Sequence, residues 1–204
     1  MRANINIHNM DCMVAMKEME DNQFDLAIVD PPYGIGVNSM NMGSRKTIKP
    51  TDKKWDKKVP DDSYFKELKR VSAEQIIWGG NYFNLTPTRC FLVWDKGEMM
   101  YRRSFAECEL AWTSFDKSAR MIIINPTQLV RIHPTQKPVL LYKWLLQNHA
   151  KKNDKILDTH LGSGSIAIAC WDLKFDLTGY ELDEEYYNAA MNRFNTHCTQ
   201  GQLF

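Results

Sequence analysis

The stretch Phe24-Asp25-Leu26-Ala27-Ile28-Val29-Asp30-Pro31-Pro32-Tyr33 joins an apolar run to a double proline. Neither proline can donate a hydrogen bond to a β-ladder, and each fixes its own backbone φ, so a buried strand must end here. A carboxylate, backbone carbonyls and an aromatic ring then lie at the carboxyl end of the strand. The oxygens can accept N–H bonds from a flat amino-bearing ring, and Tyr33 can stack on its face. The stretch therefore indicates either a site for the exocyclic amine of a nucleobase or a strand that ends in a plain turn.

Short apolar segments alternate with amphipathic segments along the rest of the chain. This order predicts an α/β fold with a mainly parallel, twisted sheet and helices on both faces. The expected strands are 5–8, 25–29, 75–78, 90–94, 110–113, 155–157 and 177–180. The expected helices are 12–19, 63–71, 139–150, 165–171 and 184–194. The segments 34–60 and 118–136 are expected to be irregular loops.

Length and composition limit the class of protein. The chain has 204 residues, 44% of them hydrophobic, which suits one domain over 1–204 with no separate large recognition domain. No stretch reaches the ~20 apolar residues of a membrane span, and the start of the chain lacks the apolar core of a secretory signal. We therefore expect a cytoplasmic protein. The five cysteines form no Cys-x-x-Cys pair, which argues against a disulfide framework and a metal site.

A second candidate site lies at 156–165, where Ile-Leu-Asp-Thr-His-Leu-Gly-Ser-Gly-Ser joins an apolar strand to a helix. Glycines permit close approach of a ligand, and the first turn of a helix offers free N–H groups. The next strand ends at Glu181, where an αβ unit places a carboxylate against ribose hydroxyls. The turn lacks the third glycine of a dinucleotide motif and the Gly-Lys-Ser/Thr of a phosphate loop. This pattern favours an adenosine-type cofactor without a phosphate chain over a plain turn.

Three segments together resemble the S-adenosylmethionine-dependent DNA amino-methyltransferases, in the group (beta class) whose Asp-Pro-Pro-Tyr motif precedes the cofactor glycine motif. They are 9–12 with 24–33, then Ile132-His133-Pro134-Thr135-Gln136-Lys137-Pro138, then 158–165. The resemblance covers nearly the whole chain and implies a Rossmann-like methyltransferase fold with permuted motif order. Ribosomal-RNA methyltransferases with a similar motif place it after the cofactor loop, so the order favours DNA as the substrate.

The resemblance also implies a catalytic motif made of Asp30, Pro31, Pro32 and Tyr33. Asp30 and a backbone carbonyl near Pro31 would accept hydrogen bonds from the target amine, and Tyr33 would stack on the base. The base must first leave the DNA duplex. The methyl group would then pass directly and in line from S-adenosylmethionine, without a metal or a covalent intermediate.

The residues that the resemblance places at the cofactor form a longer set. Asp158, Gly162 and Gly164 would line the methionine moiety, and Glu181 would bind the ribose. Asp11 with Cys12 would meet the adenine edge, although Asp11 could equally be a helix N-cap. His133, Thr135 and Lys137 would close the site beside the methionine carboxylate. The full set is Asp11, Cys12, Asp30, His133, Thr135, Lys137, Asp158, His160, Gly162, Ser163, Gly164, Ser165 and Glu181, in which His160 stands where the family usually has phenylalanine.

Family members with Asp at the head of the motif mostly methylate adenine N6, and those with Ser mostly methylate cytosine N4. The resemblance therefore predicts a site-specific DNA adenine-N6 methyltransferase, within a restriction–modification system or alone. The alternatives are a cytosine-N4 enzyme, an inactive DNA-binding relative and a cofactor-binding regulatory subunit. None of these readings identifies the recognition sequence.

Contacts with double-stranded DNA are expected from loops at about 34–60 and 118–131. The segment 45–58 contains seven basic residues and two acidic ones. Such a basic run can bind a polyanion or be a solvated loop. The DNA-binding candidates are Arg45, Lys46, Lys49, Lys53, Lys54, Arg120 and Arg131.

The tail Gln200-Gly201-Gln202-Leu203-Phe204 resembles the short peptide by which bacterial replication proteins bind the sliding clamp. Gln200, Leu203 and Phe204 would make that contact. The alternative is a tail that binds nothing. A homodimer is a further possible assembly.

Overall fold

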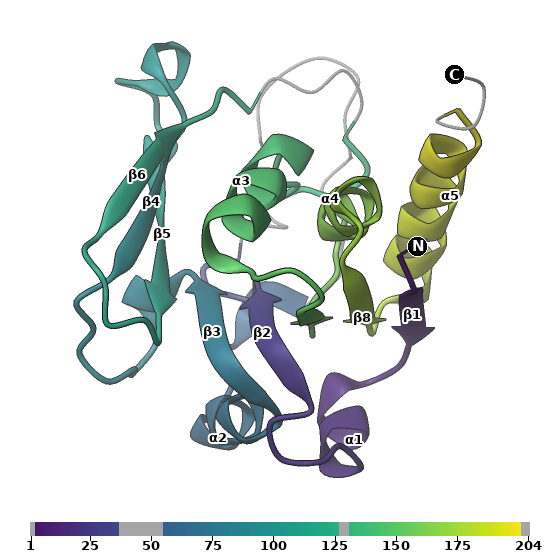
Figure 1. The fold of residues 1–204 in the computed structure, drawn as a ribbon. Helices are drawn as coiled ribbons and strands as arrows, with labels where there is room; N and C mark the ends of the chain where they lie inside the picture. Colours follow the sequence, from purple (N-terminus) through teal and green to yellow (C-terminus); the bar gives the residue numbers. More distant parts are fainter. Residues whose placement is uncertain (1–2, 37–54, 127–130, 201–204) are drawn as a thin grey trace.

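Strand β2, Phe24–Val29, lies in the interior of the sheet and is covered on both faces (Figure 1). Leu26 and Ile28 pack into the core on one face, and Ala27 and Val29 pack into the core on the other. A strand segment that is buried on both faces must be apolar, which explains the unbroken run from Leu26 to Val29 after the exposed Asp25. Its pairing with the next strand ends at Val29, as the two prolines require.

The computed structural model describes residues 3–36, 55–126 and 131–200, and in this part of the chain eight strands form one sheet. Adjacent strands are parallel except at β5, which is antiparallel to both β3 and β4. In spatial order the strands are β1 Ile5–Asn9, β8 Asp176–Glu181, β7 Lys155–Asp158, β2, β3 Ser72–Trp78, β5 Cys108–Thr113, β4 Phe91–Asp95 and β6 Arg120–Ile123.

Helices cover both faces of this sheet (Figure 1). Helices α1, Cys12–Lys17, and α2, Asp62–Val71, share one core with the sheet. The other core contains α3, Val139–His149, α4, Ser165–Leu173, and α5, Glu184–Gln200. No described helix combines the length and the apolar character needed to cross a membrane.

Local signals in the sequence start several of these helices. The carboxylates of Asp11 and Asp61 accept hydrogen bonds from the first-turn N–H groups of α1 and α2, so both act as N-caps. Pro138 stands directly before α3 and needs no hydrogen-bond acceptor for its nitrogen. The helix N-cap interpretation of Asp11 is therefore confirmed.

The predicted α/β class and all the predicted strands and helices are confirmed, with small differences at their ends. The prediction of an irregular segment over 118–136 is wrong for Arg120–Ile123, which forms β6 and pairs in parallel with β4. Strand β6 has a single neighbour and exposes Met121 and Ile123. It therefore lacks the two-sided burial that makes β2 recognisable. In the segment 34–60, a short 3-10 helix covers Trp55–Lys57, and 37–54 lie outside the described residues.

The central pair β2 and β7 brings distant parts of the chain together. The two strands are parallel, with Leu26 opposite Ile156 and Ala27 opposite Leu157. Their carboxyl ends therefore meet at the same edge of the sheet, one followed by Asp30 and the other ending at Asp158. Crevices at the carboxyl ends of strands are where open α/β sheets bind ligands.

Candidate active site

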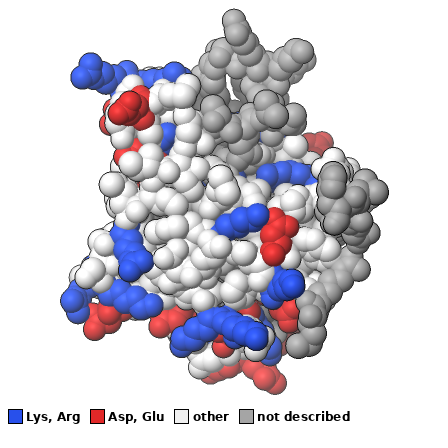
Figure 2. All heavy atoms as spheres, turned by 45° about the horizontal axis from the view of Figure 1, so that its top comes forward, with Lys and Arg blue, Asp and Glu red and all other residues white. Residues whose placement is uncertain are grey.

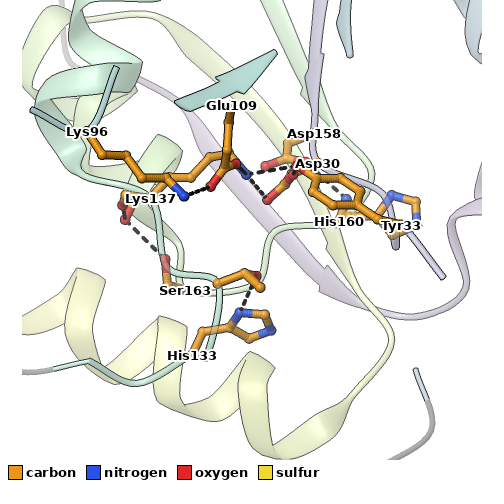
Figure 3. Close-up of polar contacts among 11 residues, drawn as sticks. Asp30, Tyr33, Lys96, Glu109, His133, Lys137, Asp158, His160 and Ser163 are labelled. Atoms are coloured by element: carbon orange, nitrogen blue, oxygen red, sulfur yellow. Dashed lines mark hydrogen bonds and ion pairs between the residues drawn. The ribbon is translucent and has the colours of Figure 1, made fainter. Parts of the chain in front are cut away.

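Four charged side chains form a connected network at the carboxyl end of β2 (Figure 3). Lys137 Nζ lies 2.5 Å from Asp30 Oδ2 and 3.1 Å from Glu109 Oε2. The other oxygen of Glu109 lies 2.9 Å from Lys96 Nζ. Four elements position these residues: Asp30 follows β2, Lys96 follows β4, Glu109 lies in β5, and Lys137 precedes α3. We call this set of four residues the charge network.

Burial and mutual attraction set the ionisation of the charge network. Burial raises the pKa of Asp30, although the neighbouring ammonium of Lys137 opposes this effect. Burial also disfavours the ammonium of Lys137, but the carboxylates of Asp30 and Glu109 outweigh it and raise the pKa of Lys137. Burial likewise acts against the Glu109 carboxylate, but the two lysines outweigh it and lower its pKa. Two positive and two negative charges thus balance one another away from water.

Tyr33 joins the charge network to a group of aromatic rings. Its hydroxyl donates to Asp30 Oδ1 at 2.6 Å, and its ring stacks on Tyr82 with centroids 4.9 Å apart. Phe83 meets the Tyr33 ring edge-on. These three rings form what we call the aromatic platform. It requires Gly79, because a Cβ built there would lie 2.2 Å from the Tyr33 ring.

The glycine turn follows β7 and leads into α4. Gly162 and Gly164 have positive φ angles of 53° and 68°, which favour glycine over residues with a Cβ. The Gly162 N–H donates to Glu181 Oε2 at 2.8 Å, and the Asp183 N–H donates to the other oxygen of Glu181. Glu181 at the end of β8 therefore hydrogen-bonds directly to the glycine turn.

Further contacts from α5 and from the segment 132–138 hold this turn in place. Arg193 in α5 donates to the Ser163 carbonyl at 2.7 Å and to Ser165 Oγ at 2.9 Å. Ser165 Oγ in turn donates to the Lys137 carbonyl at 2.7 Å. The ring of His133 lies 3.7 Å from the Cβ position of Gly162. The segment 132–138 and the glycine turn are thus in direct contact.

Asp158 is the buried acid at the end of β7, with 1% of its surface exposed. Its Oδ1 accepts from the His160 N–H at 3.0 Å. Burial raises the pKa of Asp158 to about 8, and the nearby carboxylates of Asp30 and Glu181 act in the same direction. Burial also lowers the pKa of His160 to about 4, so this ring is neutral at pH 7. A positively charged ligand beside Asp158 would favour its carboxylate form.

The raised pKa of Asp158 gives a stability prediction. Between pH 4 and 8 the folded protein holds a proton on Asp158 that the unfolded chain releases, so stability should fall as the pH rises. The slope from this one group is up to about 1.4 kcal/mol per pH unit, and it ends near pH 8. Urea unfolding at intervals from pH 5 to 9 measures it. Asp158→Asn should show a flatter profile, and parallel profiles for the two proteins would contradict the assignment.

The structure brings most of the expected site residues to one edge of the sheet. Asp30 belongs to the charge network and Tyr33 adjoins it, and the glycine turn adjoins Asp158 and Glu181. The Lys137 carbonyl contacts the glycine turn and its ammonium binds Asp30 and Glu109, and its expected role beside the methionine carboxylate stays a prediction. The other expected cofactor contacts are Asp11, Cys12, His133, Thr135, His160, Ser163, Gly164 and Ser165, and their roles stay predictions.

The expected DNA-binding residues are only partly described. Arg120 is exposed at the start of β6, where its guanidinium donates to Asn148 Oδ1, and half-buried Arg131 donates to the Pro126 carbonyl. On the face in Figure 2, Lys and Arg are interspersed with Asp and Glu over the described residues. Gln200 ends α5. Outside the described residues lie Arg45, Lys46, Lys49, Lys53, Lys54, Leu203 and Phe204.

Several residues of the site carry no motif that would identify them in the sequence. Glu109 lies in β5 and Lys96 directly follows β4, in segments that look structural. The pairing of β5 with β4 brings these two residues together, and Glu109 then contacts Lys137. Arg193 lies in an amphipathic helix without a distinctive neighbour. A usable signal exists for Gly79, since a Gly-Gly pair directly after an apolar strand indicates a close approach of backbone and side chain.

Comparison with known proteins gives a consistent result. A family model described as DNA methylase matches residues 93–192. The type II methyltransferase M.HpaI of Haemophilus parainfluenzae is 24% identical over 230 aligned positions, which cover 89% of this chain and 71% of that protein.

Two solved structures share the fold. The complex of M1.HpyAVI with SAM is 22% identical, covers 94% of this chain and 99% of its own, and has a TM-score of 0.60. The cytosine-N4-specific PvuII DNA methyltransferase is 12% identical, covers 95% of this chain and 87% of its own, and has a TM-score of 0.63. The likeness confirms the expected Rossmann-like architecture.

Proposed function

Because the chain belongs to the family of S-adenosylmethionine-dependent DNA amino-methyltransferases, we propose that it methylates the N6 amine of adenine in DNA. One observation carries the proposal. The carboxyl ends of β2 and β7 place Asp30 and Tyr33 beside Asp158 and the glycine turn. An amine-binding motif and a cofactor motif from distant parts of the chain therefore share one edge of the sheet.

The amine side of the reaction rests on Asp30 and the aromatic platform. The Asp30 carboxylate accepts an N–H bond from the target amine, which aims the nitrogen lone pair at the methyl donor. It also stabilises the positive charge that develops on nitrogen as the new N–C bond forms. A base that leaves the duplex gains a stacking surface on the platform, worth about 1–3 kcal/mol by analogy with single-stranded DNA binding.

The cofactor side fits a ligand that carries positive charge and no phosphate chain. S-adenosylmethionine, when bound, supplies an electrophilic methyl group on a positively charged sulfur. The buried Asp158 is an acid whose carboxylate needs a nearby cation, and the ammonium or the sulfonium of this ligand provides one. Both oxygens of Glu181 already accept a backbone N–H and keep lone pairs for ribose hydroxyls.

Adenine is preferred over cytosine because the catalytic motif begins with Asp30, the residue that resembles the adenine-N6 members. The alternative is cytosine-N4 methylation, because the chain also shares its fold with a cytosine-N4-specific enzyme. The inactive relative is disfavoured, because Asp30, Tyr33, Asp158 and the glycine turn are all present and close together.

The decisive experiment incubates the protein with radiolabelled S-adenosylmethionine and unmethylated DNA, followed by digestion to nucleosides. We expect label in N6-methyladenine. Label in N4-methylcytosine would select the alternative. No label in any unmethylated DNA, from a folded protein, would remove the proposed activity. DNA recovered from a first round and methylated again is the matched control, and it should accept little further label.

A further inference from the structure

The ammonium of Lys137 lies inside the amine-binding motif. Its Nζ is 2.5 Å from Asp30 Oδ2 and 3.3 Å from the Tyr33 hydroxyl, and the residue is 3% exposed. The ammonium also lies 5.7 Å from the centre of the Tyr33 ring. Figure 3 shows the side chain of Lys137 extending toward Asp30 and Glu109. Any base held by Asp30 and Tyr33 would therefore meet this ammonium.

The pair formed by Asp30 and Lys137 offers an acceptor next to a donor. The reacting edges of adenine and cytosine present the complementary order, an amine N–H₂ group next to an unprotonated ring nitrogen. Guanine and thymine present a carbonyl oxygen next to a ring N–H at the equivalent edge. Enzymes that act on an extruded base read this edge by hydrogen bonds. An acceptor–donor pair at this spacing thus selects adenine and cytosine, in which an exocyclic amine adjoins an unprotonated ring nitrogen.

The hydrogen bonds of Lys137 leave one N–H available for a base. An ammonium has three N–H donors. Asp30 and Glu109 accept two of them, and the third points toward the Tyr33 oxygen over the longest of the three distances, 3.3 Å. A contact of that length is weak and can be exchanged for a ring nitrogen. Tyr33 keeps its own hydrogen bond to Asp30 after the exchange.

Glu109 fixes the lysine in this position. It lies in β5 and is held from the other side by Lys96 at 2.9 Å, so its carboxylate has two cationic neighbours. Without Glu109 the ammonium would have Asp30 as its single carboxylate partner among the residues described, and it would compete directly with the target amine for that acceptor. With Glu109 the ammonium has a second carboxylate partner, so the Asp30 carboxylate can also accept a hydrogen bond from the target amine.

We propose that Lys137 donates a hydrogen bond to the ring nitrogen beside the target amine, N1 of adenine, and that Glu109 is the positioning residue for this contact. The inference rests on the proposed function, which supplies the base. It differs from the role beside the methionine carboxylate that the sequence resemblance implies for Lys137.

The test compares DNA that carries the target adenine with the same DNA carrying 1-deazaadenine, in which C–H replaces N1. For the unmodified protein we expect the deaza substitution to lower kcat/KM about 10- to 100-fold, because a buried donor loses its acceptor. For Lys137→Met we expect both DNAs to react at similar, lower rates. For Glu109→Gln we expect an intermediate ratio. Comparing ratios between proteins removes the intrinsic difference in reactivity between the two amines.

Lys143→Met is the matched control, since Lys143 also forms an ion pair, to Asp172 at 2.7 Å, but lies in α3 away from the charge network. It should keep the unmodified ratio. Circular dichroism checks folding, and if Lys137→Met unfolds, the ratio for Glu109→Gln decides. An unchanged deaza ratio in the lysine and glutamate variants overturns the inference, as does a rise in KM for S-adenosylmethionine alone. If the unmodified protein labels cytosine, 3-deazacytosine takes the place of 1-deazaadenine, and if it labels no DNA, the proposed function itself fails.

Discussion

Replacing Asp30 by alanine is expected to lower the rate of methyl transfer at least about 10³-fold, at the upper end of what loss of one preorganised electrostatic contact costs. The change removes the acceptor for the amine and the negative charge that stabilises the developing cation. It also leaves the Lys137 ammonium near the reacting nitrogen without its closest counter-charge, which adds repulsion. Single-turnover transfer of labelled methyl groups to DNA, at saturating cofactor, measures the effect on the chemical step.

Asp25→Ala is the matched control for this prediction. Asp25 lies at the opposite end of β2, where its carboxylate accepts the Lys155 N–H at 2.8 Å. Its loss should change the rate less than about threefold, because surface substitutions away from a site have small effects. Asp30→Asn separates charge from hydrogen bonding, since the amide oxygen still accepts. Full activity in Asp30→Ala would end the proposed mechanism.

The second large effect is expected from Gly79→Ala, on both stability and activity. Gly79 has a φ of +72°, and a Cβ there would lie 2.2 to 2.7 Å from three atoms of the Tyr33 ring. Backbone strain of about 1–2 kcal/mol adds to the cost of displacing a packed ring, typically about 1–3 kcal/mol. We expect the free energy of unfolding to fall by about 2–5 kcal/mol in urea titrations. Methyl transfer should also fall sharply, because Tyr33 leaves Asp30.

Gly97→Ala isolates the steric part of that prediction. Gly97 also has a positive φ, +80°, but a Cβ there meets only Ile123 at an ordinary 3.6 Å. It should cost the backbone strain alone, and activity should stay near normal. A Gly79→Ala, Tyr33→Ala double variant should be more stable than the sum of the single changes indicates, because the clash disappears. Additive losses of stability in the Gly79→Ala, Tyr33→Ala double variant would show that the ring is not displaced.

Much of the fold could be predicted because its determinants are local or periodic. The apolar run before Asp30 and the double proline mark a buried strand and its end, and β7 with its glycine turn is equally clear. Strand β6 was not predictable in the same way, since Arg120–Ile123 is an edge strand in which three of the four residues are exposed. Its existence depends on the neighbouring strand β4.

The residues of the candidate site likewise fall into those that local motifs identify and those that only long-range contacts bring to the site. Motif residues such as Asp30, Tyr33 and Gly162 stand in short sequence motifs whose order along the chain predicts their site. Glu109 and Lys96 do not, because Lys96 meets Glu109 through the pairing of β4 with β5, and Glu109 meets Lys137 through the approach of the segment before α3. The ion pairs of Lys137 with Asp30 and Glu109 could likewise not be read from the sequence, from which the resemblance implies only a role beside the methionine carboxylate. Long-range ion pairs of this kind have no signature in a single sequence.

The pairing of β2 with β7 also sets when the site can exist during synthesis. Val29 ends β2 and Asp158 ends β7, 129 positions apart, and the two strand ends together form the site edge. At about 5–20 residues per second, a ribosome needs roughly 6–25 s between the two strands. During that time the apolar edge of β2 lacks its neighbour β7, and the motif from Asp30 to Tyr33 lacks the glycine turn. The nascent chain thus cannot act on DNA before most of it has been made, and its exposed central strand is the point where early aggregation would begin.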